Sequence, residues 1–262
     1  MSGQLWNRMA VVALVLMSAA CSDYKNPTDP EPQDPGAVLT GTGNLGTVIG
    51  QFRTSRGGDS ANKVAGEQLT GRREINWEAV NGANLNSNAF QFDLFNTTIP
   101  RGQVFTTPGT GLRVSDNRAV DIDSSYAAQF NPFSGSKTFF AVGSTQMNVV
   151  FEVAGSTAAA TVNGFGVVFS DVDLAGSARV EYYSAGGTLL RAVQAPVRSD
   201  SAGFSFVGVT FDQPVVGLVK IFSGQAPLAA GTKDISAGGT QDLVIVDDFI
   251  GGEPHAKTAA LH

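Results

Sequence analysis

The stretch that decides the fold opens with Thr161-Val-Asn-Gly-Phe-Gly-Val-Val-Phe-Ser-Asp-Val-Asp173 and closes with Asp242-Leu-Val-Ile-Val-Asp-Asp-Phe-Ile250. Between these blocks lie β-branched and aromatic segments at 178–184, 188–193, 204–211 and 215–222. Gly, Pro, Asp or Ser separates each segment from the next. Short apolar segments divided by turn residues are typical of β-strands. The stretch therefore predicts a meander of short strands.

The sequence before this stretch carries the same signals. Ile75 and Trp77 alternate with polar residues, as do Phe90, Phe92 and Leu94, and this is the period of a strand with one buried face. Further strands are predicted at 47–53, 104–105, 112–115, 137–142 and 146–153. The predicted fold is all-β, a two-sheet antiparallel sandwich of jelly-roll type that spans 38–253 as one domain.

The last predicted strand is apolar on both faces. Leu243, Ile245 and Asp247 alternate with Val244, Val246 and Asp248, so a regular strand places the two sets on opposite faces. Apolar residues on both faces indicate a central strand that is covered on both sides. The same alternation assigns Phe249 to the face of Leu243 and Ile245 and predicts that its side chain is core.

Composition restricts the class of protein. The chain has 262 residues with 31 Gly and 17 Phe, and 15% of its residues are charged. Long helical patterns of Leu, Ala, Glu and Lys are missing, which favours an all-β fold. The net charge of −6 and the lack of a Lys/Arg cluster argue against a nucleic-acid partner.

Histidine and cysteine are nearly missing. The one cysteine is Cys21, and the histidines are His255 and His262. The predicted sandwich therefore holds no Ser-His-Asp triad, no Cys-His pair and no His-ligated zinc.

The first 37 residues predict export and anchoring. Residues 1–20 combine Arg8 with a short apolar run and small residues, as a signal peptide does. Cys21 follows in a sequence similar to a bacterial lipobox, although Ser18 stands where Leu is usual, and an ordinary secretory signal is the alternative. Residues 21–37 then form the predicted acylated cysteine and a Pro-rich tether. Residues 254–262 are predicted to be a disordered tail.

Four blocks carry a resemblance to known proteins: Gly71-Arg-Arg-Glu-Ile-Asn-Trp77, Pro100-Arg-Gly-Gln-Val-Phe-Thr-Thr-Pro-Gly-Thr-Gly111, Gly164-Phe-Gly-Val-Val-Phe-Ser-Asp-Val-Asp173 and Val246-Asp-Asp-Phe249. They resemble uncharacterised exported bacterial lipoproteins. The last two blocks are similar to jelly-roll-like sandwich domains of PEP-CTERM-type surface proteins. The resemblance covers about 70–253 and implies a fold and an exported location but no activity. We expect anchoring through Cys21 in place of that group's C-terminal sorting tail.

Four aspartates form the candidate metal site. Asp171 and Asp173 alternate at a strand end, and Asp247 and Asp248 lie in the last strand. Oxygen ligands of this kind suit calcium, the one cofactor that the sequence suggests. A turn at 171–173 and a solvent-facing aspartate in the last strand explain the same residues without a metal. The residues alone favour this plainer interpretation.

Two other side-chain types are candidates for a function. Paired carboxylates would serve a glycoside hydrolase or lyase, and the acids in or near predicted strands are Glu74, Glu78, Asp93, Glu152 and Glu181. Aromatic side chains would stack on sugars, and the candidates are Trp77, Tyr126, Tyr182 and Tyr183. Trp77 is assigned to the core because it alternates with Ile75. Tyr182 and Tyr183 point to opposite faces of a strand, so one of them is exposed on a given side.

These observations predict a protein of the cell envelope that is anchored by lipid in the outer membrane. Its sandwich is predicted to be a binding or adhesion module without catalytic activity, with a glycan or matrix ligand. A carboxylate-based glycoside hydrolase or lyase is the first alternative. A purely structural envelope protein is the second.

Overall fold

Two antiparallel sheets build the protein in the computed structural model, which describes residues 35–57, 61–198 and 203–257. These residues belong to one compact unit. The predicted signal peptide, Cys21 and nearly all of the tether lie outside the described residues.

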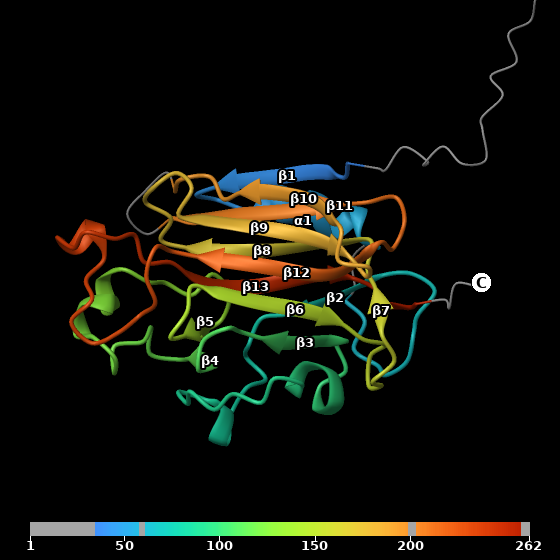
Figure 1. Cartoon of the computed structure of the whole chain (residues 1–262), viewed down its shortest axis with the longest axis horizontal. Coiled ribbons are helices and arrows are strands. Elements are labelled where there is room, and N and C mark those ends of the chain that lie inside the picture. Colours follow the sequence, from blue (N-terminus) through green and yellow to red (C-terminus); the bar gives the residue numbers. More distant parts are fainter. Residues whose placement is uncertain (1–34, 58–60, 199–202, 258–262) are drawn as a thin grey trace, which may run out of the picture. The chain divides into compact units, whose positions relative to one another are not determined.

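The sheets have seven and five strands, and a separate ribbon has two. The seven-stranded sheet has the order β1 (Ala37–Thr42), β11 (Phe204–Thr210), β8 (Gly164–Ser170), β13 (Ile245–Gly252), β5 (Thr138–Val142) and β4 (Gly111–Ser115), and β2 (Arg72–Ile75) also pairs with β13. The five-stranded sheet has the order β10 (Leu189–Gln194), β9 (Ala178–Ser184), β12 (Val216–Ser223), β6 (Gln146–Phe151) and β3 (Gln103–Thr106). β14 (His255–Ala256) pairs with β7 (Ala160–Thr161). Figure 1 shows the five-stranded sheet in front of the larger one.

Helical segments are few, and the all-β sandwich is confirmed: 39% of the described residues are strand and 12% are helical. The described helices are α1 (Gly46–Ser55), three short 3₁₀ turns at Gly82–Asn84, Ser124–Ala128 and Ile235–Ala237, and one π-type turn at Leu94–Thr98. Within the described residues, none of these helices has the length and apolar character needed to span a bilayer.

An aromatic cluster fills the space between the sheets. Trp77 is fully buried, and its ring stacks on Phe139 with centroids 3.9 Å apart. Phe249 meets the edge of Trp77 at 5.1 Å and Phe165 at 5.3 Å. Aromatic pairs at these separations stabilise a core beyond the area that they bury. The predicted core positions of Trp77 and Phe249 are therefore confirmed.

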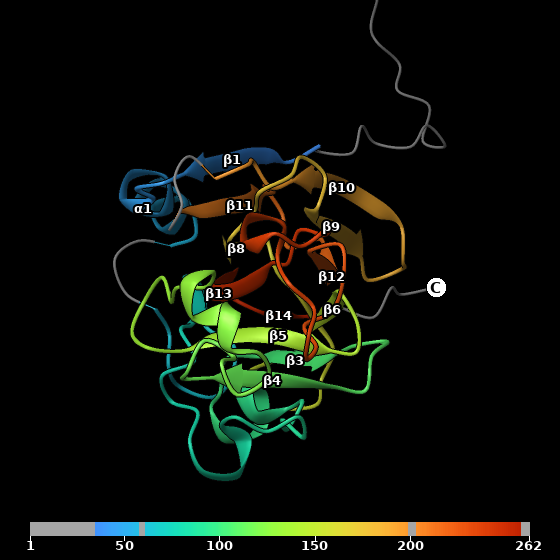
Figure 2. The same ribbon diagram turned by 90° about the vertical axis from the view of Figure 1, so that its left-hand side faces the viewer.

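The predicted strand at 47–53 is wrong, because these residues lie in α1. Leu45, Ile49 and Phe52 recur at helical spacing and pack on the outer face of the large sheet, and this spacing outweighs the β-branched residues nearby. A Cβ on Gly208 would lie 2.7 Å from the ring of Phe52, so glycine there lets the helix approach the sheet. Figure 2 shows α1 beside β1 and β11, on the side away from β9 and β12.

Two other predicted strands are shorter or missing. β2 ends at Ile75, and Trp77 has the left-handed φ of 64°, so its indole reaches the core from a turn and not from a strand. Phe90 and Phe92 lie in a loop that leads into the π-type turn, and Leu94 is the first residue of that turn. The polar residues between these apolar side chains imitate a strand period where the chain is irregular.

β13 is a central strand buried on both faces, as predicted, but Phe249 lies on the face opposite to the predicted one. Val246 pairs with Phe169 of β8, whereas Phe249 pairs with Val167, and the register shifts between them. The shift places one extra residue in β13, which is a β-bulge. Phe249 consequently faces the inner core with Val246, and not the outer cluster that contains Leu243 and Ile245.

The end of the sandwich also differs from the predicted boundary. The 254–262 segment was expected to be a disordered tail, but His255 and Ala256 form β14 and pair with Thr161 and Ala160. Residues 258–262 lie outside the described part of the chain.

Candidate functional site

One edge of β13 changes its partner strand at Asp247 and Asp248. Val246 pairs with Phe139 of β5, whereas Phe249 to Gly252 pair with Ile75 to Arg72 of β2. The bulge lies between these two pairings. The main chain there is held in part by Trp77, whose Nε1 donates a hydrogen bond to the carbonyl oxygen of Asp247 at 3.0 Å.

The bulge brings two neighbouring carboxyl groups together. Adjacent residues of a regular strand point to opposite faces, but Asp247 and Asp248 both reach the loop at 133–134. Oδ2 of Asp247 accepts a hydrogen bond from the main-chain N–H of Phe133, and Oδ1 of Asp248 accepts one from Oγ of Ser134. Both residues are buried, with 0% and 4% of their surface exposed, so the expectation that one of them faces solvent is wrong.

Burial changes the proton affinity of this pair. The pKa of Asp247 is raised to about 9, first by burial and then by the charge of Asp248. Burial also raises the pKa of Asp248, against the hydrogen bond from Ser134. Two buried carboxyl groups in contact cannot both ionise cheaply. The two carboxyl groups therefore hold one proton between them at neutral pH.

A polar pocket of about 530 Å³ adjoins Asp248. Its lining residues come from α1, β2, the bulge and the loops beside them: Arg53, Ala61, Lys63, Arg72, Glu74, Asn76, Arg101, Ser134 and Asp248. We call this cavity the β13 pocket. Four of its side chains are basic and two are acidic, and its volume lies within the usual range for small-molecule sites, about 300–1,000 Å³.

Glu74 is the anionic centre of the β13 pocket. Arg53 donates to it from Nε at 2.8 Å and from Nη2 at 3.0 Å, and Arg72 Nε donates at 2.5 Å. Burial acts to raise the pKa of Glu74, but the hydrogen bonds and charges of the two arginines outweigh burial and hold this pKa below its usual value. Glu74 is therefore ionised at neutral pH.

Arg53 joins the two acids of the pocket. Its Nη2 also lies 4.0 Å from Oδ2 of Asp248. Glu74 and Asp248 both approach this nitrogen, so the two carboxylates lie close to each other. One carboxylate is ionised and the other belongs to a proton-holding pair, so the pocket presents both an acceptor and an acid.

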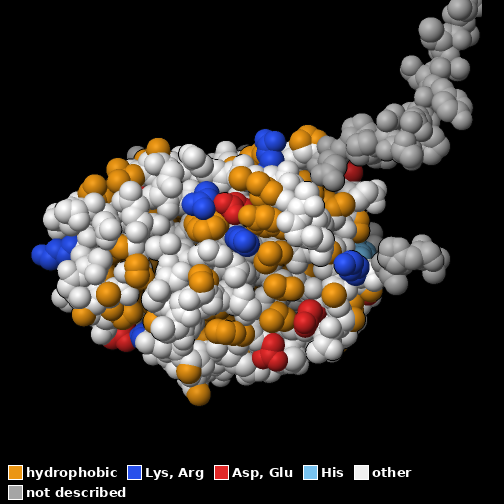
Figure 3. All heavy atoms as spheres, viewed as in Figure 1, with side chains coloured by type: hydrophobic (Ala, Val, Ile, Leu, Met, Phe, Trp, Pro, Cys, Tyr) orange, Lys and Arg blue, Asp and Glu red, His pale blue; other side chains and the backbone are white. Residues whose placement is uncertain are grey.

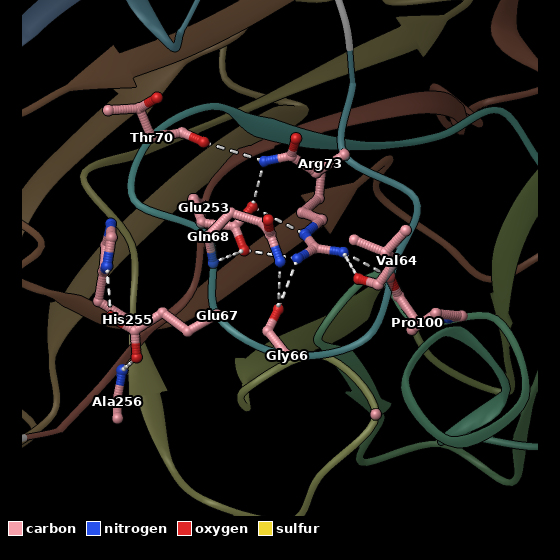
Figure 4. Close-up of polar contacts among 12 residues, drawn as sticks. Val64, Gly66, Glu67, Gln68, Thr70, Arg73, Pro100, Glu253, His255 and Ala256 are labelled. Carbon is pink, nitrogen blue, oxygen red and sulfur yellow. Dashed lines mark hydrogen bonds and ion pairs between the residues drawn. The ribbon is translucent and has the colours of Figure 1, made fainter.

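A buried ion pair fixes the loop that supplies Lys63 to the pocket (Figure 4). Arg73 donates to Glu253 from Nε at 2.8 Å and from Nη2 at 2.5 Å. The same guanidinium donates to the carbonyl oxygens of Val64, Gly66 and Pro100. On β2, Arg73 therefore points to the side opposite Arg72 and Glu74, where it ties the 62–70 loop to the end of β13.

The predicted metal ligands fall into two groups. One carboxylate oxygen from each of Asp171, Asp173 and Asp234 lies within 4.8 Å of the others. Asp247 and Asp248 form the separate pair at the bulge. Asp234, which the sequence analysis did not select, starts the 3₁₀ turn at Ile235–Ala237; only the folded chain brings it to Asp171.

The aromatic candidates mostly belong to the core. Trp77, Tyr126 and Tyr182 are fully buried. Tyr183 lies on the outer side of β9, half-buried, with Lys220 Nζ 4.8 Å from its ring centroid, which confirms the predicted split between the two tyrosines. Figure 3 views the face of the five-stranded sheet, where charged side chains are sparse and hydrophobic ones scattered.

Of the five acids considered for glycoside hydrolysis, only Glu74 lines the β13 pocket. Glu181 pairs with Arg179, Glu78 accepts from Ser136, and Glu152 accepts from Asn96. The pocket's basic residues were not selected from the sequence. The one available signal was the charged run Arg72-Arg-Glu74 inside a predicted strand, where apolar residues are usual.

The fold and the pocket define a class: an antiparallel β-sandwich with a charged pocket on the outer face of one sheet, beside a helix. Comparison with known protein families, with curated proteins and with solved structures gave no match.

Proposed function

We propose that this protein is a cell-envelope protein, anchored by lipid at Cys21, whose sandwich binds a carboxylate-bearing saccharide in the β13 pocket without catalysis. The observation that carries the proposal is the excess of cations in that pocket. The lining has four basic side chains, those of Arg53, Lys63, Arg72 and Arg101, and two acids, Glu74 and Asp248. Asp248 shares a proton with Asp247.

The chemistry of the lining supports an acidic sugar. Guanidinium groups bind carboxylates through paired hydrogen bonds. Hydroxyl groups both donate and accept, so they suit a site in which Glu74 and Asn76 lie next to basic side chains. Lys63 is exposed at the rim, where an ammonium can meet the ligand's charge.

A glycan array tests the proposal. We expect the lipid-free protein, residues 37–262, to bind uronate-bearing glycans more strongly than their neutral counterparts. Lys63→Gln and Arg53→Gln should each weaken that binding. Arg191→Gln, which makes the same charge change on the exposed strand β10, should leave it intact. No binding to any acidic glycan, with or without calcium, would refute the proposal and favour a purely structural envelope role.

Membrane fractionation tests the anchor separately. Cys21→Ser should abolish lipid labelling and release the protein from the membrane fraction. An unlabelled wild-type protein that partitions like the variant would overturn anchoring without affecting the pocket.

A glycoside hydrolase is the second candidate, because the β13 pocket holds two carboxyl groups whose pKa values are shifted in opposite directions. Ionised Glu74 and Asp248, which shares a proton with Asp247, approach the same nitrogen of Arg53. Environments that push two pKa values apart are typical of an acid and its partner in glycoside hydrolysis. Release of reducing ends from an acidic polysaccharide, lost in both Glu74→Gln and Asp248→Asn, would establish this activity. No release from any acidic or neutral polysaccharide would exclude it.

A further inference from the structure

The end of β8 brings three aspartates into one cluster. Asp171 follows the last residue of β8 with a left-handed φ of 75°, and Asp173 comes two residues later. Asp234 reaches them from the segment before β13. One oxygen from each lies within 4.8 Å of the others.

Buried oxygens without hydrogen-bond donors single this cluster out. Asp171 is 1% exposed, and within the described residues no group donates a hydrogen bond to its Oδ2. Oδ2 of Asp173 and Oδ1 of fully buried Asp242 are also without a donor there. A buried carboxylate oxygen that accepts nothing is costly. The lone pairs of these carboxylate oxygens are therefore free to bind a ligand that accepts electron pairs, such as a cation.

Arg198 accounts for one side of the cluster. Its Nη1 lies 2.8 Å from Oδ1 of Asp171, and its Nε lies 2.6 Å from Oδ1 of Asp173. The guanidinium thus contacts the Oδ1 atom of each carboxylate, whereas neither Oδ2 atom accepts a hydrogen bond from the described residues. Arg198 fixes the orientation of both carboxylates while those oxygens stay available.

The charge of the cluster also favours a cation. Among the described groups that act on Asp171, Arg198 is the cation, whereas Asp234, Asp173 and Asp242 are anions. A water molecule could satisfy the lone pairs, but it would leave the excess negative charge.

We propose that Asp171, Asp173 and Asp234 bind one calcium ion. All three ligands are hard oxygens, which calcium prefers and zinc does not. Oxygens bound to one calcium ion at about 2.3–2.6 Å can lie up to about 5 Å apart, compared with about 4 Å around magnesium. The observed cluster therefore accepts calcium with little rearrangement.

Asp242 positions the ligands. Its Oδ2 accepts hydrogen bonds from the main-chain N–H groups of Asp173 and Leu174 at 2.9 and 2.7 Å. Calcium would join the turn after β8 to the segment before β13, two stretches far apart in sequence. This site is separate from the β13 pocket and does not depend on the proposed function.

Calorimetry and thermal melting of the full-length protein in detergent test the proposal. After chelation and dialysis, calcium chloride should bind with a stoichiometry of one and raise the melting temperature, since an ion that binds only the folded state stabilises it. Magnesium chloride at the same concentration should do so less. A calcium titration without a heat of binding, together with a melting temperature that is the same in calcium and in EDTA, would overturn the proposal.

Variants locate the ion. Asp173→Asn and Asp234→Asn should each lower calcium affinity by about tenfold or more, the scale on which ligand or neighbouring-shell changes act. Asp116→Asn, at an exposed aspartate outside the cluster, should not. If both cluster variants fold and bind calcium like the wild type, the ion lies elsewhere and the proposal is wrong. If they fail to fold, the wild-type titrations still decide it.

Discussion

The indole nitrogen of Trp77 donates a hydrogen bond to the main-chain carbonyl oxygen of Asp247 at 3.0 Å. Trp77 is the centre of the aromatic core, and Asp247 lies in the bulge beside the β13 pocket. The hydrogen bond is made where β13 has left β5 and not yet met β2. The packing of the core is thereby coupled to the geometry of the proton-holding pair.

We expect Trp77→Phe to lower the free energy of unfolding by about 1–3 kcal/mol, because the Asp247 carbonyl loses a buried donor. The left-handed φ of 64° at this residue adds backbone strain that the tryptophan's packing must offset. Urea unfolding measures the change. A stability equal to that of the wild type would show that this hydrogen bond does not support the bulge.

The carboxyl pair predicts a pH-dependent stability. The pKa of Asp247 is raised to about 9, whereas an aspartate in the unfolded chain has a value of about 4. A group with a raised folded pKa contributes stability that is complete below the unfolded pKa and is lost as pH rises through the folded pKa. This contribution should therefore fall between about pH 4 and pH 9.

Asp247→Asn removes that dependence while keeping an acceptor for Phe133 and adding a donor for Asp248. We expect the variant to exceed the wild type in stability by about 1–3 kcal/mol at pH 8 and to lose the advantage at pH 4. Urea unfolding at both pH values measures this difference, with exposed Asp116→Asn as the control. An advantage that is the same at pH 4 and pH 8 would contradict proton sharing.

Breaking the buried ion pair of Arg73 and Glu253 should lower stability more than breaking an exposed ion pair does. Arg73→Met leaves the Glu253 carboxylate uncompensated and removes donors from three carbonyl oxygens, so we expect a loss of about 3–5 kcal/mol. Replacing both residues, as Arg73→Met with Glu253→Leu, should recover part of that loss.

The matched control for this pair is Arg179→Met. Arg179 and Glu181 pair at 2.9 Å on the outer side of β9, with 40% of the arginine side chain exposed, and pairs of this kind contribute about 0–1 kcal/mol. Equal losses in Arg73→Met and Arg179→Met, measured by urea unfolding, would show that burial does not distinguish the two pairs.

The sandwich was predictable because each strand's alternation is local. The strands from β8 onward follow β-branched and aromatic runs between turn residues, and those signals need no tertiary information. α1 was missed because Leu45, Ile49 and Phe52 form a helical stripe within a segment whose β-branched residues favour a strand. In short segments the two periods are hard to separate.

The sites were less predictable, because they depend on irregularities and long-range contacts. Strand alternation places Asp247 and Asp248 on opposite faces, and only the bulge puts both beside Phe133 and Ser134. Asp234 joins Asp171 through the path of the chain, which no local pattern records. Glu74 was among the candidate acids, but its partner Asp248 could not be chosen without coordinates.

Phe249 offers the sharpest test of the bulge. The register shift turns its side chain inward, where it contacts Trp77, Phe105, Phe139 and Phe165. Phe249→Ala should therefore lower the free energy of unfolding by about 3–5 kcal/mol, because it leaves a cavity between the sheets. Phe92→Ala, at a side chain 38% exposed in a loop, should cost much less. Urea unfolding compares the two variants, and equal losses would mean that Phe249 is not held in the inner core by the bulge.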